Sequence, residues 1–157
     1  MTSTRVGVVA LGLVSVLAMA TPAESLEVEV VAVRASERGP SDIELLPLRA
    51  RLRRLVGYRA FQVVQREQRQ CAWRAEEEFA LPGGRWLHLM PKGMDEQAVM
   101  MQVRLLDGRR RLVDTHVRLN NRGTMLFGVP RSGRDTVAGQ DGQSVPGALL
   151  ILIRAEE

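Results

Sequence analysis

The chain has 157 residues and a formal net charge of +4, and 45% of its residues are hydrophobic while only 4% are aromatic. This length fits one domain with a core large enough to fold without disulfide bonds, and it leaves no second domain to assign. The modest charge and the scarcity of aromatic side chains that stack on bases argue against a nucleic-acid partner.

The first 23 residues have the three parts of a secretory signal peptide: a positive charge at Arg5, an apolar run over residues 6–20, and small residues after it. The run is shorter than the roughly 20 apolar residues that a membrane-spanning helix needs. We therefore predict a signal peptide over residues 1–23 that is cleaved after Ala20 or Ala23, with an uncleaved anchor as the alternative. No cysteine lies there to accept a lipid, so we expect a released chain, periplasmic or extracellular, with no stable membrane span.

The remaining residues, 24–157, are expected to form a single β-rich domain. Residues 26–34 alternate between apolar and acidic side chains, which predicts a half-buried strand. A turn at 39–42 then leads into a helix, expected from about Pro47 to Val56. Gly57 would end this helix, and Pro47 either opens it at its first turn or follows a separate short turn over residues 43–46.

The predicted helix is amphipathic, with an apolar stripe and arginines outside it. The stripe consists of Leu45, Leu48, Leu52, Leu55 and Val56. Arg49 and Arg53 are candidate contacts for an anionic partner, such as a phosphate-bearing glycolipid or an acidic polysaccharide of the envelope. The alternative is that these arginines only form the solvated face of the helix.

Beyond Gly57 the apolar spacing changes from helical to alternating, which predicts strands. We place them at residues 59–65, 71–81, 85–90, 98–106, 109–119, 124–129 and 148–153. Asp107–Gly108 is typical of a hairpin turn, and short connections after residue 82 predict sequential antiparallel pairing.

The glycine-rich residues 130–147 predict an exposed mobile loop. The apolar run at 148–153 requires cover on both faces, as a central strand or one beneath the helix. The predicted fold is mainly β, an antiparallel β-sandwich or a partly open barrel with one amphipathic helix.

Residue types that carry chemistry are few. His88, His116 and Cys71 are too irregularly spaced for a metal motif, so we predict no metal and no cofactor. Ser132, His116 and Asp114 lack a nucleophile elbow and an oxyanion-hole loop. No catalytic residue is predicted.

Two residues of the predicted strand at 71–81 need separate treatment. Cys71 is in phase with the apolar side chains, which predicts a buried and unreactive thiol, with a disulfide between chains as the alternative. Glu77 is in the same phase, so its carboxylate would enter the core unless the strand bulges or ends early.

Arg109, Arg110 and Arg111 form the densest basic run, directly after the predicted hairpin turn. They are a second candidate patch for an anionic partner. The alternative is a solubilising strand end that prevents edge-to-edge pairing.

The order of signal peptide, strand, leucine-rich helix and β meander resembles uncharacterised small exported bacterial proteins, on residues 42–58, 81–85 and 119–124. This resemblance implies an exported bacterial domain and supplies no activity. The last 40 residues are also similar to hairpins of outer-membrane secretins, on Gly123–Thr124, Gly128 and 149–153. The chain is far too short to be a secretin, so this likeness implies at most an accessory or assembling β module.

These observations predict an exported, non-enzymatic β domain that binds an envelope or secretion protein, with its oligomeric state left open. One alternative is a hydrolase of envelope polymers that uses Glu77 or the pair Asp114 and His116. The other is a self-assembling subunit whose strand at 148–153 adds to a neighbouring chain.

Overall fold

The computed structural model describes residues 25–129, 136–138 and 144–157. The predicted signal peptide and most of the predicted loop at 130–147 therefore lie outside the described residues. The elements, with η1 a 3-10 helix, are β1 (Ser25–Ser36), η1 (Ile43–Leu48), α1 (Arg49–Val56), β2 (Ala60–Ala72), β3 (Glu77–Leu81), β4 (Arg85–Asp95), β5 (Ala98–Asp107), β6 (Arg110–Asn120), β7 (Thr124–Gly128), β8 (Thr136–Ala138) and β9 (Ser144–Glu156).

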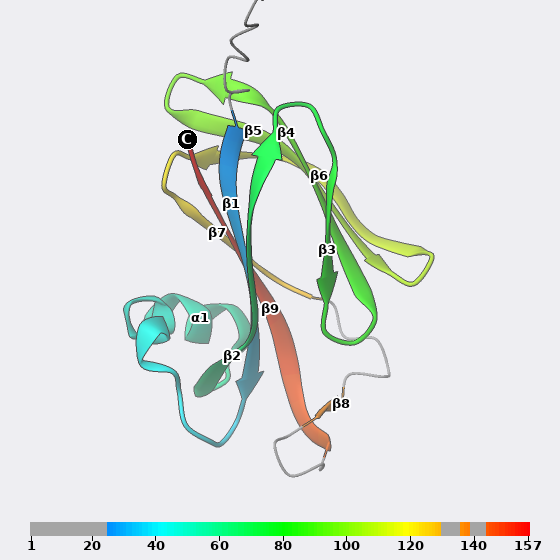
Figure 1. Cartoon of the computed structure of the whole chain (residues 1–157). Helices are drawn as coiled ribbons and strands as arrows, with labels where there is room; N and C mark the ends of the chain where they lie inside the picture. The colour runs from blue at the N-terminus through cyan, green and yellow to red at the C-terminus, as the bar shows by residue number, and fades with distance from the viewer. Residues whose placement is uncertain (1–24, 130–135, 139–143) are drawn as a thin grey trace, which may run out of the picture.

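Two antiparallel sheets pack face to face, with the short helix against one of them (Figure 1). Sheet A has the strand order β2-β1-β9-β7, with β8 also paired to β9, and sheet B has the order β3-β4-β5-β6. The predicted sandwich with one helix is confirmed. Within the described residues, no helix has the length and the apolar character that crossing a membrane requires.

The expected sequential pairing after residue 82 holds in sheet B and fails at β7. The turn at 120–123 carries the chain from β6 to the other sheet, where β7 pairs with β9. Arg122 has a left-handed φ of 62° at this turn, and its N–H donates to the Ala155 carbonyl at 2.9 Å. The apolar strand β9 thereby acquires a neighbour on each edge.

The main core lies between the sheets. Its fully buried members include Val28 of β1, Phe79 of β3, Leu105 of β5 and Ile151 of β9. A second cluster lies on the opposite face of sheet A, where Leu45 and Leu52 of the helices pack on β1, β2 and β9. β9 is thus covered on both faces, as its unbroken apolar run predicts.

The strand expected at 71–81 is wrong in its extent. β2 is one strand from Ala60 to Ala72, because β1 supplies backbone partners along its length even where β2 has polar side chains. The chain then turns at Arg74, which has a φ of 64°, before β3 begins at Glu77. The strand ends early, so the Glu77 carboxylate stays 31% exposed at the sheet edge and pairs with Arg69 at 3.5 Å.

The helical segment also differs from expectation. It begins as the 3-10 turn η1, which contains Pro47, and α1 starts only at Arg49. Asp42 occupies the N-cap position, but its Oδ2 accepts the Val63 N–H at 2.6 Å and makes no cap hydrogen bond. Gly57 ends α1 as predicted, with a φ of 76°.

β4 is longer than the predicted strand at 85–90 and continues to Asp95. A register shift between Pro91 and Gly93 absorbs the proline, which has no N–H for the ladder. Leu87 and Leu89 are buried, but Trp86 on the other face is 42% exposed, so only one face of β4 is fully covered.

Cys71 is fully buried in the main core. Burial raises the pKa of its thiol to about 11, and the negative charge of Glu77 adds to this rise. Because the folded-state pKa exceeds the ordinary value of 9.0, the stability contributed by the neutral thiol is complete below pH 9 and is lost as the pH rises towards 11.

We therefore expect the free energy of unfolding to fall by about 2–3 kcal/mol more in the native protein than in Cys71→Ala between pH 9 and 11. Urea titrations at both pH values measure this difference, and the variant corrects for other titrating groups. Equal changes in the two proteins, or rapid alkylation of the folded native protein at pH 8, would contradict a buried thiol.

Candidate functional site

η1 and α1 together form an arm, residues 43–56, that projects from the outer face of sheet A (Figure 1). In α1 only Leu52 is fully buried, and in η1 only Leu45 is buried. The Ser41 hydroxyl fastens the start of the arm to β2 by accepting the Phe61 N–H at 3.1 Å, next to the bond that Asp42 accepts. The arm is thus anchored by the side that faces sheet A, and its other sides are exposed to solvent.

Apolar side chains of the arm reach solvent. Ile43 is 82% exposed, Leu46 51% and Leu55 53%. They are three of the five large hydrophobic side chains that are exposed in the described part of the chain, the others being Val64 and Trp86. The exposure of Leu55 corrects its predicted place in the buried stripe, because the short α1 turns that side chain past the edge of the contact with sheet A.

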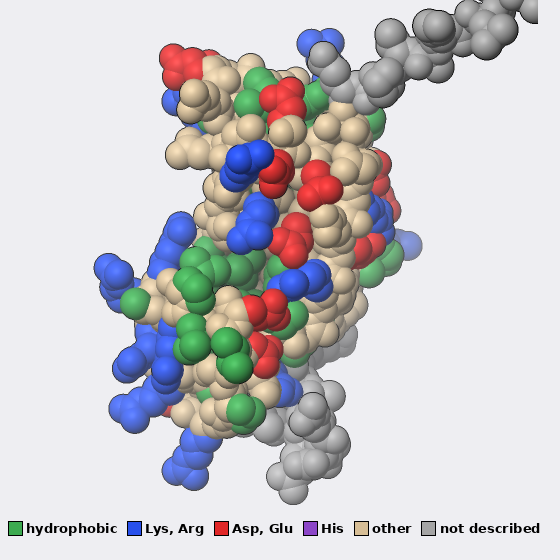
Figure 2. Space-filling view, turned by 60° about the vertical axis from the view of Figure 1, so that its left-hand side comes forward, with side chains coloured by type: hydrophobic (Ala, Val, Ile, Leu, Met, Phe, Trp, Pro, Cys, Tyr) green, Lys and Arg blue, Asp and Glu red, His purple; other side chains and the backbone are tan. Residues whose placement is uncertain are grey.

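The arm also carries four exposed arginines, Arg49, Arg51, Arg53 and Arg54. Within the described residues, none of their guanidinium groups has a carboxylate at ion-pair distance. Arg54 donates from Nε to the Ala50 carbonyl at 3.4 Å, inside its own helix. In Figure 2, arginine side chains project along one edge of the molecule, next to hydrophobic side chains over the arm.

The arginines of the sheets are different, because nearly all of those with exposed guanidinium groups have acidic partners. Those paired with a carboxylate are Arg66, Arg69, Arg104, Arg111, Arg118, Arg122 and Arg154. Most of these pairs join residues that are far apart in sequence, such as Arg122 with Glu156 at 2.7 Å. In the described part of the chain, the arm carries the longest run of exposed arginines without a carboxylate partner, and Arg38, Arg59, Arg74, Arg109 and Arg110 also lack one.

A cleft of about 220 Å³ lies between η1 and the outer face of sheet A. Val31, Leu45 and Leu152 contribute apolar walls. Its charged rim is internally neutralised, since Arg66 binds Glu29 at 3.3 Å and Glu44 at 2.5 Å and Arg154 approaches Glu29 at 3.6 Å. The rim offers no surplus charge to a ligand, in contrast to the adjoining arm.

The basic run at the β5–β6 hairpin is also exposed, but carboxylates accompany it. Arg111 binds Asp114 at 2.8 Å, and Arg110 lies across the strands from Asp107 without an ion pair to it. Arg109 lies in the turn itself. Of the two predicted basic patches, the one containing Arg49 and Arg53 is therefore less neutralised than the hairpin patch.

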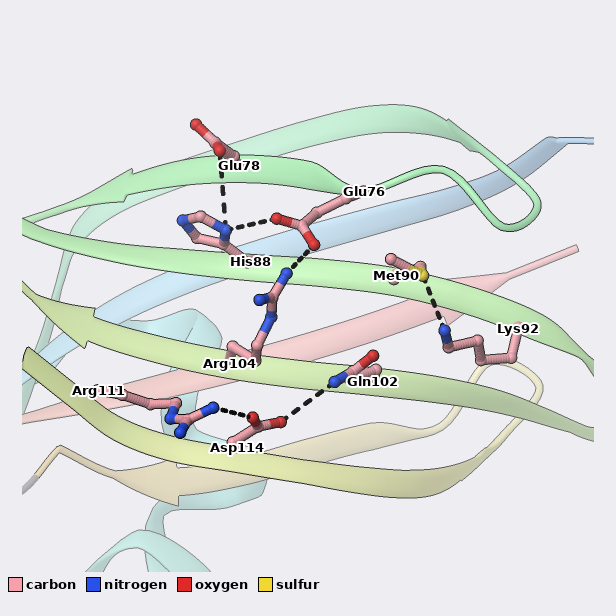
Figure 3. Close-up of polar contacts among 9 residues, drawn as sticks. All are labelled: Glu76, Glu78, His88, Met90, Lys92, Gln102, Arg104, Arg111 and Asp114. Carbon is pink, nitrogen blue, oxygen red and sulfur yellow. Dashed lines mark hydrogen bonds and ion pairs between the residues drawn. The ribbon is translucent and has the colours of Figure 1, made fainter. Parts of the chain in front are cut away.

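The outer face of sheet B carries a polar network that sequence reasoning missed (Figure 3). Glu76 binds His88 Nδ1 at 2.7 Å and also binds Arg104, while Glu78 lies 3.7 Å from the same nitrogen. Among the described residues, Glu76, Glu78 and His88 are the one group of three whose ligand atoms lie close enough for a metal ion. Arg104 already neutralises Glu76, so these contacts are those of an ion-pair network between strands.

Asp114 and His116, which were considered for catalysis, do not hydrogen-bond to each other. Asp114 accepts hydrogen bonds from Gln102 at 3.2 Å and from Arg111, and these contacts hold the pKa of its carboxyl below its ordinary value (Figure 3). Its partners are thus Gln102 and Arg111, whereas His116 is paired across the strands with Gln102. Ser132 lies outside the described residues.

Comparison with protein family models, with curated proteins and with solved structures finds no match to this chain. The functional inference therefore depends on the chain's own residues.

Proposed function

We propose that this protein is an exported, non-enzymatic binding module of the bacterial cell envelope, and that the arm is its binding surface. The proposal is carried by the combination of four arginines without acidic partners and three exposed aliphatic side chains on one short segment. Such a segment would be poorly solvated on its apolar side and repelled by its own charges. An anionic partner with an apolar component relieves both costs.

Export is the second part of the proposal and is supported by the sequence of residues 1–23. The paired arginines of the sheets support the location of the surface, because among the described residues the arm is the segment where four unpaired arginines lie together. The partner is a component of the envelope or of a secretion assembly.

The test is to express the chain with a C-terminal tag in a bacterium with a two-membrane envelope, separate the cell fractions and measure the N-terminus by mass spectrometry. We expect a chain that begins at Thr21 or Glu24 and cosediments with envelope material. Arg49→Gln with Arg53→Gln should be processed normally and shift to the soluble periplasmic fraction.

Arg109→Gln with Arg110→Gln is the matched control, since it removes the same charge from the other predicted patch and should leave the distribution unchanged. An intact N-terminus in the cytoplasm would contradict export. Release by the hairpin variant without release by the arm variant would place the binding surface on the hairpin.

The hydrolase and the self-assembling subunit remain alternatives, each with a constraint. A hydrolase must use Asp114 or Glu77 in spite of their arginine partners. Self-assembly cannot use the strand at 148–153 as proposed from sequence, because β9 lies between β1 and β7 with both edges paired. Among the described strands, the edges left for addition are those of β2, β3, β6, β7 and the short β8.

A further inference from the structure

We propose that the partner of the arm is an anionic phospholipid surface, on which the arm lies with its arginines among the headgroup phosphates and its aliphatic side chains below them. This inference rests on the proposed function, because it names the partner of the same surface. It commits to a bilayer and not to an acidic protein.

The first argument is the direction of the arginines. α1 advances by about 100° per residue, so Arg54 and Ala50, two positions from the anchored Leu52, lie on the opposite side of the helix. Arg51 and Arg53, one position from Leu52, lie on its two flanks. Charges that fan out over three sides fit a surface of mobile anions better than a single rigid pocket, in which guanidinium groups converge.

The second argument is the kind of apolar side chain that accompanies the arginines. Ile43 and Leu46 are three residues apart in a 3-10 turn, so they project from the same side of η1, away from the buried Leu45. Together with Leu55 they are aliphatic, and the arm contains no aromatic residue. Aliphatic side chains flanked by arginine are found in helices that lie in the membrane interface, where the arginines bind headgroups and the aliphatic groups enter the acyl boundary.

The third argument is that the side of the arm that packs on sheet A differs from the sides that are exposed to solvent. The arm is held on sheet A through one side only, by Leu52, by Leu45 and by the two hydrogen bonds that Ser41 and Asp42 accept from backbone N–H groups of β2. A lipid surface can therefore contact an exposed side of the arm without displacing any contact of the fold. The arm needs no rearrangement to bind.

The experiment measures partitioning of the exported chain onto vesicles by cosedimentation. We expect binding to vesicles of equimolar phosphatidylcholine and phosphatidylglycerol, no binding to phosphatidylcholine alone, and weakening as salt is raised. Each arginine near the surface contributes about fivefold, so changing all four arm arginines to glutamine should lower the partition coefficient by several hundred-fold, on the order of the product of four such factors.

Arg109→Gln with Arg110→Gln should change the coefficient by less than about twofold, because the hairpin does not contact the surface. Ile43→Ser with Leu46→Ser should lower it about tenfold and leave its salt dependence as in the native chain, since it removes insertion and no charge. Circular dichroism of each variant confirms that the sandwich remains folded.

The outcomes separate the two proposals. Retention of the native chain in envelopes without binding to phosphatidylglycerol vesicles overturns the lipid surface and leaves an envelope protein or glycolipid as partner. Equal binding to both kinds of vesicle, or equal losses in the arm and hairpin variants, also overturns it. Failure of the native chain to associate with envelopes overturns the proposed function itself.

Discussion

Ile151→Ala is expected to lower the free energy of unfolding by about 2–5 kcal/mol. Ile151 is fully buried in the main core, and it lies at the middle of β9 between Ala32 of β1 and Phe127 of β7. Truncation removes its contacts with both sheets and leaves a cavity that three paired strands hold open. Urea denaturation followed by circular dichroism measures the loss.

Ile43→Ala is the matched control, because it makes the same chemical change at a side chain that is 82% exposed. It should alter the free energy of unfolding by less than about 0.5 kcal/mol. Equal losses in the two variants would mean that β9 is not the centre of the core.

Leu52→Ala should release the arm while the sandwich stays folded. Leu52 is the one fully buried side chain of α1, and its truncation should reduce the free energy of docking the arm by about 2–4 kcal/mol. Trypsin reports this directly, since the arm contains four arginines that it cleaves when the helix opens. The cleavage rate in the arm should rise roughly 30-fold or more, because cleavage tracks the open population.

Leu55→Ala provides the comparison, with the same substitution three residues later at a side chain that is 53% exposed. Its cleavage rate should stay within about threefold of that of the native chain. Faster cleavage at the sheet arginines as well as in the arm would show that Leu52 supports the whole fold.

The sequence predicts which side chains are buried better than it predicts which strands pair through their backbones. The alternation of β1, the turn after Asp107 and the double cover of β9 follow from apolar spacing, which records which side chains avoid water. The full length of β2 does not, because its residues 65–70 are polar and are held by main-chain bonds to β1. The transfer of β7 to sheet A is similar, since a short turn permits pairing with either sheet.

Only part of the candidate site could be predicted from the sequence, for a related reason. The run of arginines around Arg51 is evident in the sequence, but its importance depends on which other arginines are neutralised. Arg69 meets Glu77, Arg66 meets Glu29, and Arg122 meets Glu156 only after folding. The exposure of Leu55 depends likewise on where the short helix ends its contact with sheet A.

The position of β9 has a consequence for the order of events during folding. β1, the first strand described, pairs with β9, the last, so that Glu27 lies opposite Glu156. Sheet A cannot close until the final residues have been made, and such distant pairing slows folding. A chain that loses its last dozen residues leaves the edges of β1 and β7 that pair with β9 open to aggregation.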